Sequence, residues 1–325
     1  MINRDYSMTD LDRQIFANEL QDFVPAKVFD AHCHIWDESS ATAETVNSPL
    51  RYNCTAKDMV AYNAALFPGR ELGFLFLPTP IVGMNYAADR AWCGGQTGLV
   101  PHSANAALIA PGIKPDDLAR DIEKYHFKAL KPYLLFSTGT PYNSRIGEFV
   151  PEELVEVAAH YKLTIVLHMS KPLCASDPDN LKDLTYYTTH YPNLTWQLAH
   201  CARNFQGHYM EKSIDTLRRL DHIVYDLSAV CNDYTYYLLF KHEDKRRLFY
   251  GTDNIVAGGD HDIYAPYAYS WGGVMGGDET RKRANCILLC YEALRCLRRG
   301  AIMADVTQPE LEDIFYNNAI RHYKL

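Results

Sequence analysis

The segment KVFDAHCHI, residues Lys27–Ile35, is a short and mostly apolar run that carries two histidines near its end. Such a composition is typical of a strand that is buried on both faces of a parallel sheet. Helix-like amphipathic segments alternate with further runs of this kind, which indicates a series of βα units. These further runs are Leu72–Leu77, Ala106–Ala110, Lys128–Leu134, Leu163–His168, Leu194–His200, His222–Ser228 and Arg247–Asp253.

Eight βα units are the number that closes a (β/α)8 barrel. We therefore predict an α/β fold, a (β/α)8 TIM barrel that occupies residues 1–325 as a single domain. Helical patterns at Thr9–Phe23 and Gln308–Tyr316 predict an extra N-terminal helix and helices at the C-terminal end. An open doubly wound sheet is the alternative, although no GxGxxG motif follows the first strand.

Two acidic residues mark the starts of predicted helices in the second half of the chain. Asp177 is expected to cap a helix over Asn180–Thr189, and Asp278 a helix over Glu279–Arg298. Short acidic side chains accept hydrogen bonds from the first backbone N–H groups of a helix, which explains their preference for this position.

Composition excludes several classes of protein. The 325 residues are 47% hydrophobic and 22% charged, with a formal net charge of -8, which is typical of a globular enzyme. The acidic balance disfavours nucleic-acid binding, and no apolar run approaches the ~20 residues that cross a bilayer. The nine cysteines lack disulfide-framework or CxxC spacing, and the N-terminus lacks a signal segment, so we expect a cytoplasmic protein with reduced thiols.

Polar residues stand at the ends of the predicted strands, where barrels of this type carry their sites. His32 and His34 are two positions apart on the first strand and therefore point to one face. His168, His200 and Asp253 end three other strands. An HxH pair alone is weak support for a metal site, but histidines and an aspartate at the same mouth predict one together.

Three histidines and one aspartate suit Zn²⁺, or another divalent ion such as Mn²⁺, Fe²⁺ or Co²⁺. We expect one ion. A catalytic zinc keeps a position open for water and lowers the pKa of that water to about 7. An aspartate beside it can accept the water's proton and deliver it to a leaving group.

The order of these motifs resembles the amidohydrolase superfamily, in particular the amidohydrolase-related branch that contains aminocarboxymuconate-semialdehyde decarboxylase and pyrone-dicarboxylate lactonase. The resemblance rests on FDAHCH, KALKPY, IVLHMS, LAHCAR and YGTDN, together with the closing IFYNNAIRHYKL. It implies that His32, His34 and His168 are metal ligands and that Asp253 is a ligand or the general base. It also implies that His200 polarises the substrate carbonyl or adds a ligand.

The sequence departs from the family pattern at two places. Lys131 matches the fourth-strand lysine of KxHP-type members, but Pro132 and Tyr133 replace the usual order. Lys131 is therefore expected to face the substrate or form a salt bridge, and a carboxylated, metal-bridging lysine is the alternative. The segment after His200 is CAR instead of the glycine-rich run of the decarboxylase branch, which weakens a decarboxylase assignment.

Substrate contacts are expected from the loops at the same mouth. Arg203 could bind a substrate carboxylate in bidentate fashion or pair with a neighbouring loop. Trp36, Arg51 and Tyr52 lie in the long loop after the first strand. The stretch Asn254–Gly277 could form a lid, and its His261 and Asp262 could reach the site.

The leading functional hypothesis is a metal-dependent hydrolase that acts on a C–N, ester or lactone carbonyl of a small, carboxylate-bearing molecule. A non-oxidative decarboxylase or lyase on the same metal site is the alternative, and a catalytically inactive binding barrel is a further one. We expect a small-molecule substrate, no nucleic-acid or membrane partner, and an assembly that could be a homo-oligomer.

Overall fold

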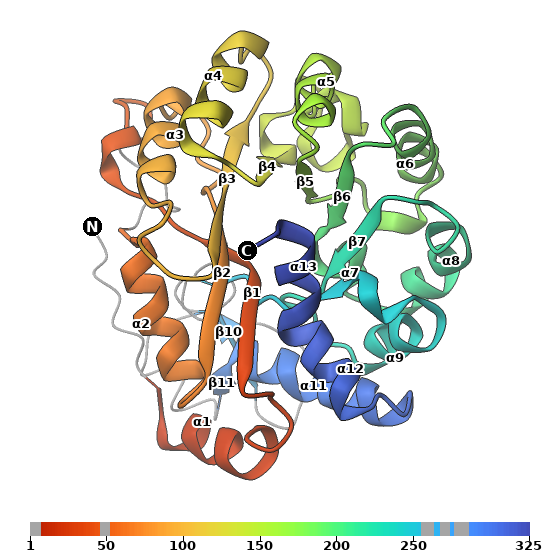
Figure 1. Ribbon diagram of the computed structural model, residues 1–325. Helices are drawn as coiled ribbons and strands as arrows, with labels where there is room; N and C mark the ends of the chain where they lie inside the picture. The colour runs from red at the N-terminus through yellow and green to blue at the C-terminus, as the bar shows by residue number, and fades with distance from the viewer. Residues whose placement is uncertain (1–7, 46–52, 255–262, 267–273, 276–285) are drawn as a thin grey trace.

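The computed structural model describes residues 8–45, 53–254, 263–266, 274–275 and 286–325. Eight parallel strands follow one another around a barrel in chain order, with helices on the outside (Figure 1). This arrangement confirms the predicted (β/α)8 fold. The strands are β1 (Lys27–His34), β2 (Glu71–Leu77), β3 (Ser103–Ile109), β4 (Ala129–Pro132), β5 (Thr164–Leu167), β6 (Thr195–Leu198), β7 (Ile223–Asp226) and β8 (Leu248–Phe249).

The barrel closes through the chain that follows β8. The backbone N–H of Ala31 donates to the carbonyl of Tyr250 at 2.9 Å, and that of Asp253 donates to the carbonyl of His32 at 2.7 Å. These bonds continue the parallel pairing beyond the two residues of β8. They also place Asp253 beside the end of β1, where the predicted ligands lie.

Helices separate the strands as predicted. The main ones are α1 (Asp10–Ile15), α2 (Ala56–Leu66), α3 (Tyr86–Gly95), α4 (Pro115–Tyr125), α5 (Glu152–His160), α6 (Pro178–His190), α8 (Gly207–Leu217), α9 (Asp233–His242) and α11 (Leu289–Met303). The extra N-terminal helix is present, because Thr9 caps α1 with a capping box and a π-helical turn over Phe16–Leu20 extends it. Asp177 caps α6 through the backbone N–H of Asp179.

The prediction of a helix over Glu279–Arg298 is wrong for Cys286–Leu288, the first residues of this range that the structure describes. Residues Cys286–Leu288 form strand β11, which pairs with β9 (Ile263–Pro266), and β9 pairs with β10 (Val274–Met275). The helix α11 begins only at Leu289. An apolar run of three residues suits either element, and the antiparallel pairing with β9 makes it a strand. Asp278 lies outside the described residues.

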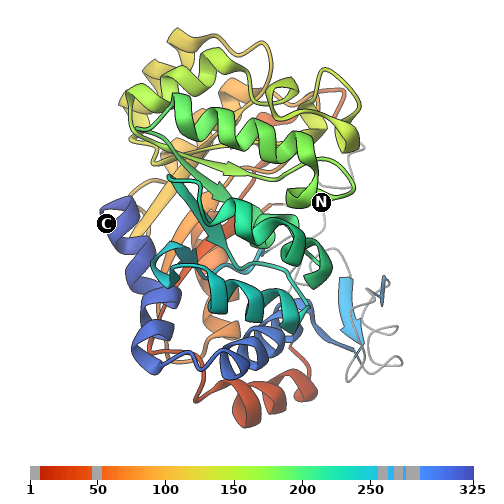
Figure 2. The ribbon, with the colours of Figure 1, turned by 90° about the vertical axis from the view of Figure 1, so that its right-hand side faces the viewer.

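The C-terminal helices close one mouth of the barrel. The chain runs through α12 (Gln308–Glu312), a π-helical turn over Asp313–Asn317 and α13 (Asn318–Tyr323), so the helical region extends beyond the predicted Tyr316. In Figure 1, α13 lies across the mouth that faces the viewer, and Figure 2 shows it from the side. The Tyr323 ring packs 6.0 Å from Phe29 and 6.2 Å from Phe249, two side chains of the barrel interior. Functional groups at the ends of the strands therefore face the other mouth.

No helix in the described part of the chain combines the length and the apolar character that crossing a bilayer requires. All nine cysteines fall in that part, and no disulfide joins any of them.

Candidate metal centre

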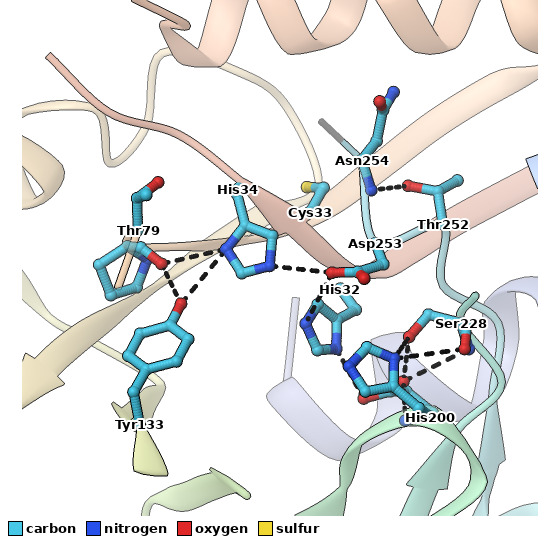
Figure 3. A network of polar contacts seen from close by, with 12 residues as sticks. His32, Cys33, His34, Thr79, Tyr133, His200, Ser228, Thr252, Asp253 and Asn254 are labelled. Atoms are coloured by element: carbon cyan, nitrogen blue, oxygen red, sulfur yellow. Dashed lines mark hydrogen bonds and ion pairs between the residues drawn. The ribbon is translucent and has the colours of Figure 1, made fainter. Parts of the chain in front are cut away.

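Two histidines of β1 form the middle of the site. His32 and His34 are both buried, and their side chains leave the same face of the strand because they are two positions apart. The ring centroids are 5.1 Å apart. Figure 3 shows both rings turned toward the carboxylate of Asp253.

Asp253 joins this pair from the chain after β8. Its Oδ1 lies 3.0 Å from Nε2 of His34 and 3.4 Å from Nε2 of His32. Its backbone φ is +60°, a left-handed conformation that costs a non-glycine residue about 1 kcal/mol. Burial by itself would raise the pKa of the Asp253 carboxyl, but the surrounding histidine rings hold that pKa well below its usual range.

The hydrogen bonds at Nδ1 of His32 and His34 determine the protonation of these two rings. Nδ1 of His32 lies 2.9 Å from Oδ2 of Asp226, and Nδ1 of His34 lies 3.0 Å from the carbonyl oxygen of Pro78. Both partners are acceptors, so Nδ1 carries a proton in each ring, and in the neutral form of the ring Nε2 offers the lone pair.

Two lone pairs and a carboxylate oxygen therefore face one another across 3.0–3.4 Å. Such an arrangement is repulsive unless positive charge lies among the three atoms, either as a proton on one of the Nε2 atoms or as a metal ion. The ligand atoms of His32, His34 and Asp253 all lie within 4.8 Å of one another, and imidazole nitrogen with carboxylate oxygen is a donor set that divalent transition metals favour. These residues fit a metal ion.

Asp226, the last residue of β7, is a central residue that the sequence analysis missed. It is fully buried, and its carboxylate holds Nδ1 of His32, the usual second partner of a metal-binding histidine. Burial would raise the pKa of Asp226, but the imidazole of His32 and other donors hold it well below its usual range. The signal that could have found it is an aspartate at the end of the apolar run IVYD, comparable with the other strand ends.

His200 and His168 continue the row of imidazoles. The ring centroid of His200 is 4.8 Å from that of His32 and 5.1 Å from that of His168. His168 directly follows β5 and stands one ring beyond His200, outside the compact group of His32, His34 and Asp253. Its Nδ1 has no hydrogen-bond partner among the described residues. Burial and the neighbouring His200 push the pKa of His168 well below its usual value, which keeps the ring neutral.

The chain that carries His200 has an unusual backbone. His200, Cys201, Ala202 and Arg203 all have left-handed φ values between 53° and 61°. A run of four such non-glycine residues costs several kcal/mol, about 1 kcal/mol or more each. Backbone strain of this kind persists where the surrounding structure enforces it, and it concentrates at functional sites. The turn directs His200 and Arg203 toward the same cavity.

Lys131, on β4, is fully buried. Its Nζ has no hydrogen-bond partner among the described residues and lies 5.0 Å from the centre of the Tyr133 ring. Desolvation lowers the pKa of Lys131 to about 8, against the opposing attraction of Asp226 and Asp253. A buried amine without a hydrogen-bond partner is costly to fold, and such groups concentrate at functional sites.

A second polar network lies behind the metal group. Asp30 accepts hydrogen bonds from Oγ1 of Thr252 at 2.6 Å, from its backbone N–H at 2.9 Å and from Nδ2 of Asn63 at 2.7 Å. Asn254 donates to Oδ1 of Asn63 at 2.9 Å. Burial raises the pKa of Asp30 to about 6 despite these bonds. The network fixes the residues on either side of Asp253 to β1 and α2.

The four histidines, Lys131 and Asp253 line a cavity of about 290 Å³. The rest of its lining is largely apolar and aromatic, from Pro80, Tyr133, Leu134, Leu135, Tyr142 and Phe205. Phe205 stacks on His200 with the ring centroids 5.7 Å apart. The cavity therefore combines a polar, metal-type group with apolar walls, as small-molecule sites do.

The proposed substrate residues fall into three groups. Arg203 lines the cavity, and its Nη1 donates to the carbonyl of Lys171 at 3.0 Å. Trp36 does not line the cavity; it is fully buried in the hydrophobic core, and its backbone pairs with Cys54. Arg51, Tyr52, His261 and Asp262 lie outside the described residues, as does most of Asn254–Gly277.

Comparison with known proteins decides the family. A family model described as amidohydrolase matches residues 29–325, which include all of the barrel strands except the first two residues of β1. The chain belongs to the amidohydrolase family. This match confirms the resemblance that the sequence motifs indicated, and it supports an enzyme of the amidohydrolase superfamily.

Solved structures share the amidohydrolase barrel at low sequence identity. The 4-oxalomesaconate hydratase from Rhodopseudomonas palustris is 17% identical with a TM-score of 0.56, and the match covers 91% of this chain and 95% of that one. A zinc-bound amidohydrolase from Burkholderia multivorans is 12% identical, with a TM-score of 0.59 and coverages of 92% and 100%. The 5-carboxyvanillate decarboxylase from Sphingomonas paucimobilis is 11% identical, with a TM-score of 0.56 and coverages of 93% and 100%. No curated protein sequence matches the chain.

Proposed function

We propose that this amidohydrolase is a metal-dependent hydrolase that acts on a C–N, ester or lactone carbonyl of a small, carboxylate-bearing molecule. The supporting observation is the convergence of two imidazole lone pairs and one carboxylate oxygen at the mouth of the barrel, with contacts of 3.0–3.4 Å. His32, His34 and Asp253 would hold a divalent ion, with Zn²⁺ the first candidate, and His168 is the proposed further ligand. Such an ion supplies Lewis-acid chemistry and lowers the pKa of water.

Asp253 is the proposed proton carrier of the reaction. Its carboxylate is ionised at neutral pH, since its pKa is held well below the usual range. It lines the cavity, where it can accept the proton of an attacking water molecule and return it to the leaving group.

Two cationic side chains favour an anionic substrate. The fully buried Nζ of Lys131 and the guanidinium of Arg203 both belong to the cavity lining. Nζ has no hydrogen-bond partner among the described residues, and a substrate carboxylate or carbonyl oxygen would satisfy it. A cavity of about 290 Å³ with apolar walls suits a small molecule that carries a charged group on a compact body.

A non-oxidative decarboxylase is the second candidate. The same two cations would hold a carboxylate next to the metal group, and proteins of similar fold include a 5-carboxyvanillate decarboxylase and a 2,6-dihydroxybenzoate decarboxylase. The two candidates differ in the product: hydrolysis gives an acid and an amine or alcohol, or one hydroxy acid from a lactone, whereas decarboxylation releases CO₂.

Metal analysis and a substrate panel test the proposal together. Protein expressed with ample zinc or manganese is expected to contain about one equivalent of metal, and less than ~0.2 equivalents would favour an inactive binding barrel. Small carboxylate-bearing esters, lactones and amides are then assayed by acid release, and small aromatic carboxylates by CO₂ release.

Two variants connect any turnover to the site. Asp253→Asn is expected to remove hydrolysis while the protein remains folded, and full activity of this variant would refute the role of Asp253. Arg203→Ala is expected to raise KM for carboxylate substrates. An unchanged KM would count against a carboxylate contact, and with it against the decarboxylase.

A further inference from the structure

We propose that Ser228 is a positioning residue which, together with Asp226, holds neutral His200 in the Nδ1–H form. His200 then offers a lone pair, not an N–H, on the side of the metal group. The use of that lone pair in turnover rests on the proposed function, whereas the hydrogen-bond arrangement itself does not.

The carboxylate of Asp226 acts as an acceptor on both oxygens. Its Oδ1 receives the backbone N–H of His200 at 3.0 Å, and its Oδ2 receives Nε2 of Gln197 at 3.0 Å. Both donors are amide nitrogens, which can donate a hydrogen bond but cannot accept one. Oδ2 also meets Nδ1 of His32 at 2.9 Å. The surroundings of Asp226 are therefore a set of donors that point at one carboxylate.

Ser228 contributes its single hydroxyl hydrogen to the same set. Its Oγ lies 2.5 Å from Oδ1 of Asp226. The carboxylate can only accept, so the hydrogen of this bond is the hydroxyl hydrogen of Ser228. Oγ also lies 2.9 Å from Nδ1 of His200. Because the hydroxyl hydrogen is used toward Asp226, Oγ meets His200 with a lone pair, and the hydrogen of that bond comes from Nδ1 of His200.

A second contact gives the same answer independently. The backbone carbonyl of Ser228 lies 3.3 Å from Nδ1 of His200, and a carbonyl oxygen can only accept. Figure 3 shows both dashed lines from the His200 ring ending on Ser228. The two contacts agree that Nδ1 carries the proton and Nε2 the lone pair.

The ring of His200 is restrained in this orientation from several sides. Ser228 is fully buried, the backbone of His200 is held by Asp226 within the left-handed turn, and Phe205 stacks on the ring with an interplanar angle of 25°. A ring flipped by 180° would place Cδ2 where Nδ1 now meets Ser228 and lose both hydrogen bonds. The orientation is therefore set by the packing as well as by the hydrogen bonds.

The Nδ1–H form of His200 determines which hydrogen bonds this residue can make in the cavity. Figure 3 shows the second ring nitrogen of His200 on the side of His32. A neutral His200 cannot donate a hydrogen bond to a substrate oxygen from there; it accepts one from water or from a substrate hydroxyl. Lys131, fully buried and lining the same cavity, is then a donor available to a developing oxyanion, with Arg203 as the other cationic donor of the lining.

The direct test is the tautomer of His200 in the chelator-treated full-length protein. Protein labelled with ¹⁵N-histidine is studied by two-bond ¹H–¹⁵N correlation NMR at a pH where the ring is neutral, and the spectrum of His200→Gln assigns the signals. The wild-type protein is expected to show a protonated Nδ1 and an unprotonated Nε2. A protonated Nε2 in the wild-type protein would overturn the proposal without any further variant.

Variants of Ser228 test its part in this arrangement. Ser228→Ala is expected to shift His200 toward a mixture of tautomers, and Ser228→Thr, which keeps the hydroxyl, to restore the Nδ1–H form. The matched control Ser213→Ala removes a buried hydroxyl on α8 that, among the residues the structure describes, bonds to carbonyls of its own helix, and is expected to leave His200 unchanged. An unchanged tautomer in Ser228→Ala would refute the role of Ser228.

A metal titration separates this proposal from the proposed function. Ser228→Ala keeps the bond between Asp226 and His32, so its zinc affinity is expected to stay within about 3-fold of wild type, below the 10–100-fold loss that follows removal of a direct partner of a ligand. A larger loss of zinc affinity would show that Ser228 supports metal binding and would contradict its specific role at His200. If the wild-type protein binds no metal but shows the expected tautomer, the proposed function fails and the role of Ser228 stands.

Discussion

Asp226 and His32 meet across a 2.9 Å hydrogen bond although they are 194 positions apart in the chain. They lie on β7 and β1, two strands that β8 separates in the barrel. The bond fixes the tautomer of His32, and the same carboxylate orders His200 and Ser228. One buried carboxylate thus organises both the metal group and the neighbouring imidazole.

Replacing this carboxylate should weaken metal binding. Asp226→Asn leaves the size of the side chain unchanged but removes the charge that holds Nδ1 of His32, so we expect a 10–100-fold lower zinc affinity. Competition with a chromophoric chelator measures it. The control Asp215→Asn, at an exposed position of α8, should bind zinc as the wild type does. Equal affinity of Asp226→Asn and wild type would contradict the proposed support of His32.

Removing the buried amine should stabilise the fold. At pH 7 the ammonium of Lys131 is buried without a hydrogen-bond partner among the described residues. Because folding lowers the pKa of Lys131 to about 8, this penalty is fully present below pH 8 and disappears as the pH rises toward 10.5. We expect Lys131→Met to raise the free energy of unfolding of the metal-free protein by about 1 kcal/mol at pH 7.

Urea denaturation at pH 7 measures this change in free energy. Lys128→Met is the control, because Lys128 precedes the same strand but is only partly buried, and it should change stability by less than about 0.5 kcal/mol. A loss of stability in Lys131→Met would show that the amine makes a stabilising contact in the folded protein.

Gly251 should be required for close packing behind His32. A Cβ atom at this position would lie 3.0 Å from Cβ of His32 and 3.2 Å from Cβ of Ser228. Gly251→Ala must therefore displace β1, at a cost of about 1–3 kcal/mol in stability, and should weaken zinc binding as well. Thermal unfolding and a zinc titration check both effects.

Gly95→Ala is the matched control for this substitution, since a Cβ atom there would meet nothing within 4 Å. It is expected to leave the melting temperature and the zinc affinity close to those of the wild type. If Gly251→Ala behaved in the same way, the contact with His32 would not restrict the site.

Asp89, which lies outside the metal group, should make the stability of the fold depend on pH. It is buried on α3, and desolvation raises its pKa to about 7 in spite of the charge of Arg90. A raised pKa in the folded state means that the contribution of neutral Asp89 is fully present below pH 3.8 and is lost as the pH rises through 7. Asp89→Asn should therefore be more stable than wild type at pH 8 by about 1 kcal/mol or more, with a clearly smaller advantage at pH 5. Urea unfolding at both pH values measures this difference in the free energy of unfolding. If the difference did not depend on pH, ionisation of Asp89 would be excluded as its cause.

The sequence by itself determined the elements and part of the site. The strands are short because their apolar runs are short, and the helices start where Thr9 and Asp177 cap them, since these signals act between residues close in the chain. The two-residue spacing of His32 and His34 fixed their common face for the same reason.

Only the tertiary structure decided which groups meet. Closure of the barrel brings Asp253 to within 3.0 Å of His34, 219 positions earlier, and it brings Asp226 and Ser228 to the imidazoles. The burial of Lys131 without a partner, and the burial of Trp36 away from the cavity, depend on neighbours from other strands and loops. Local periodicity carries no information about such neighbours, because desolvation and hydrogen-bond partners are set by the packing of the whole barrel.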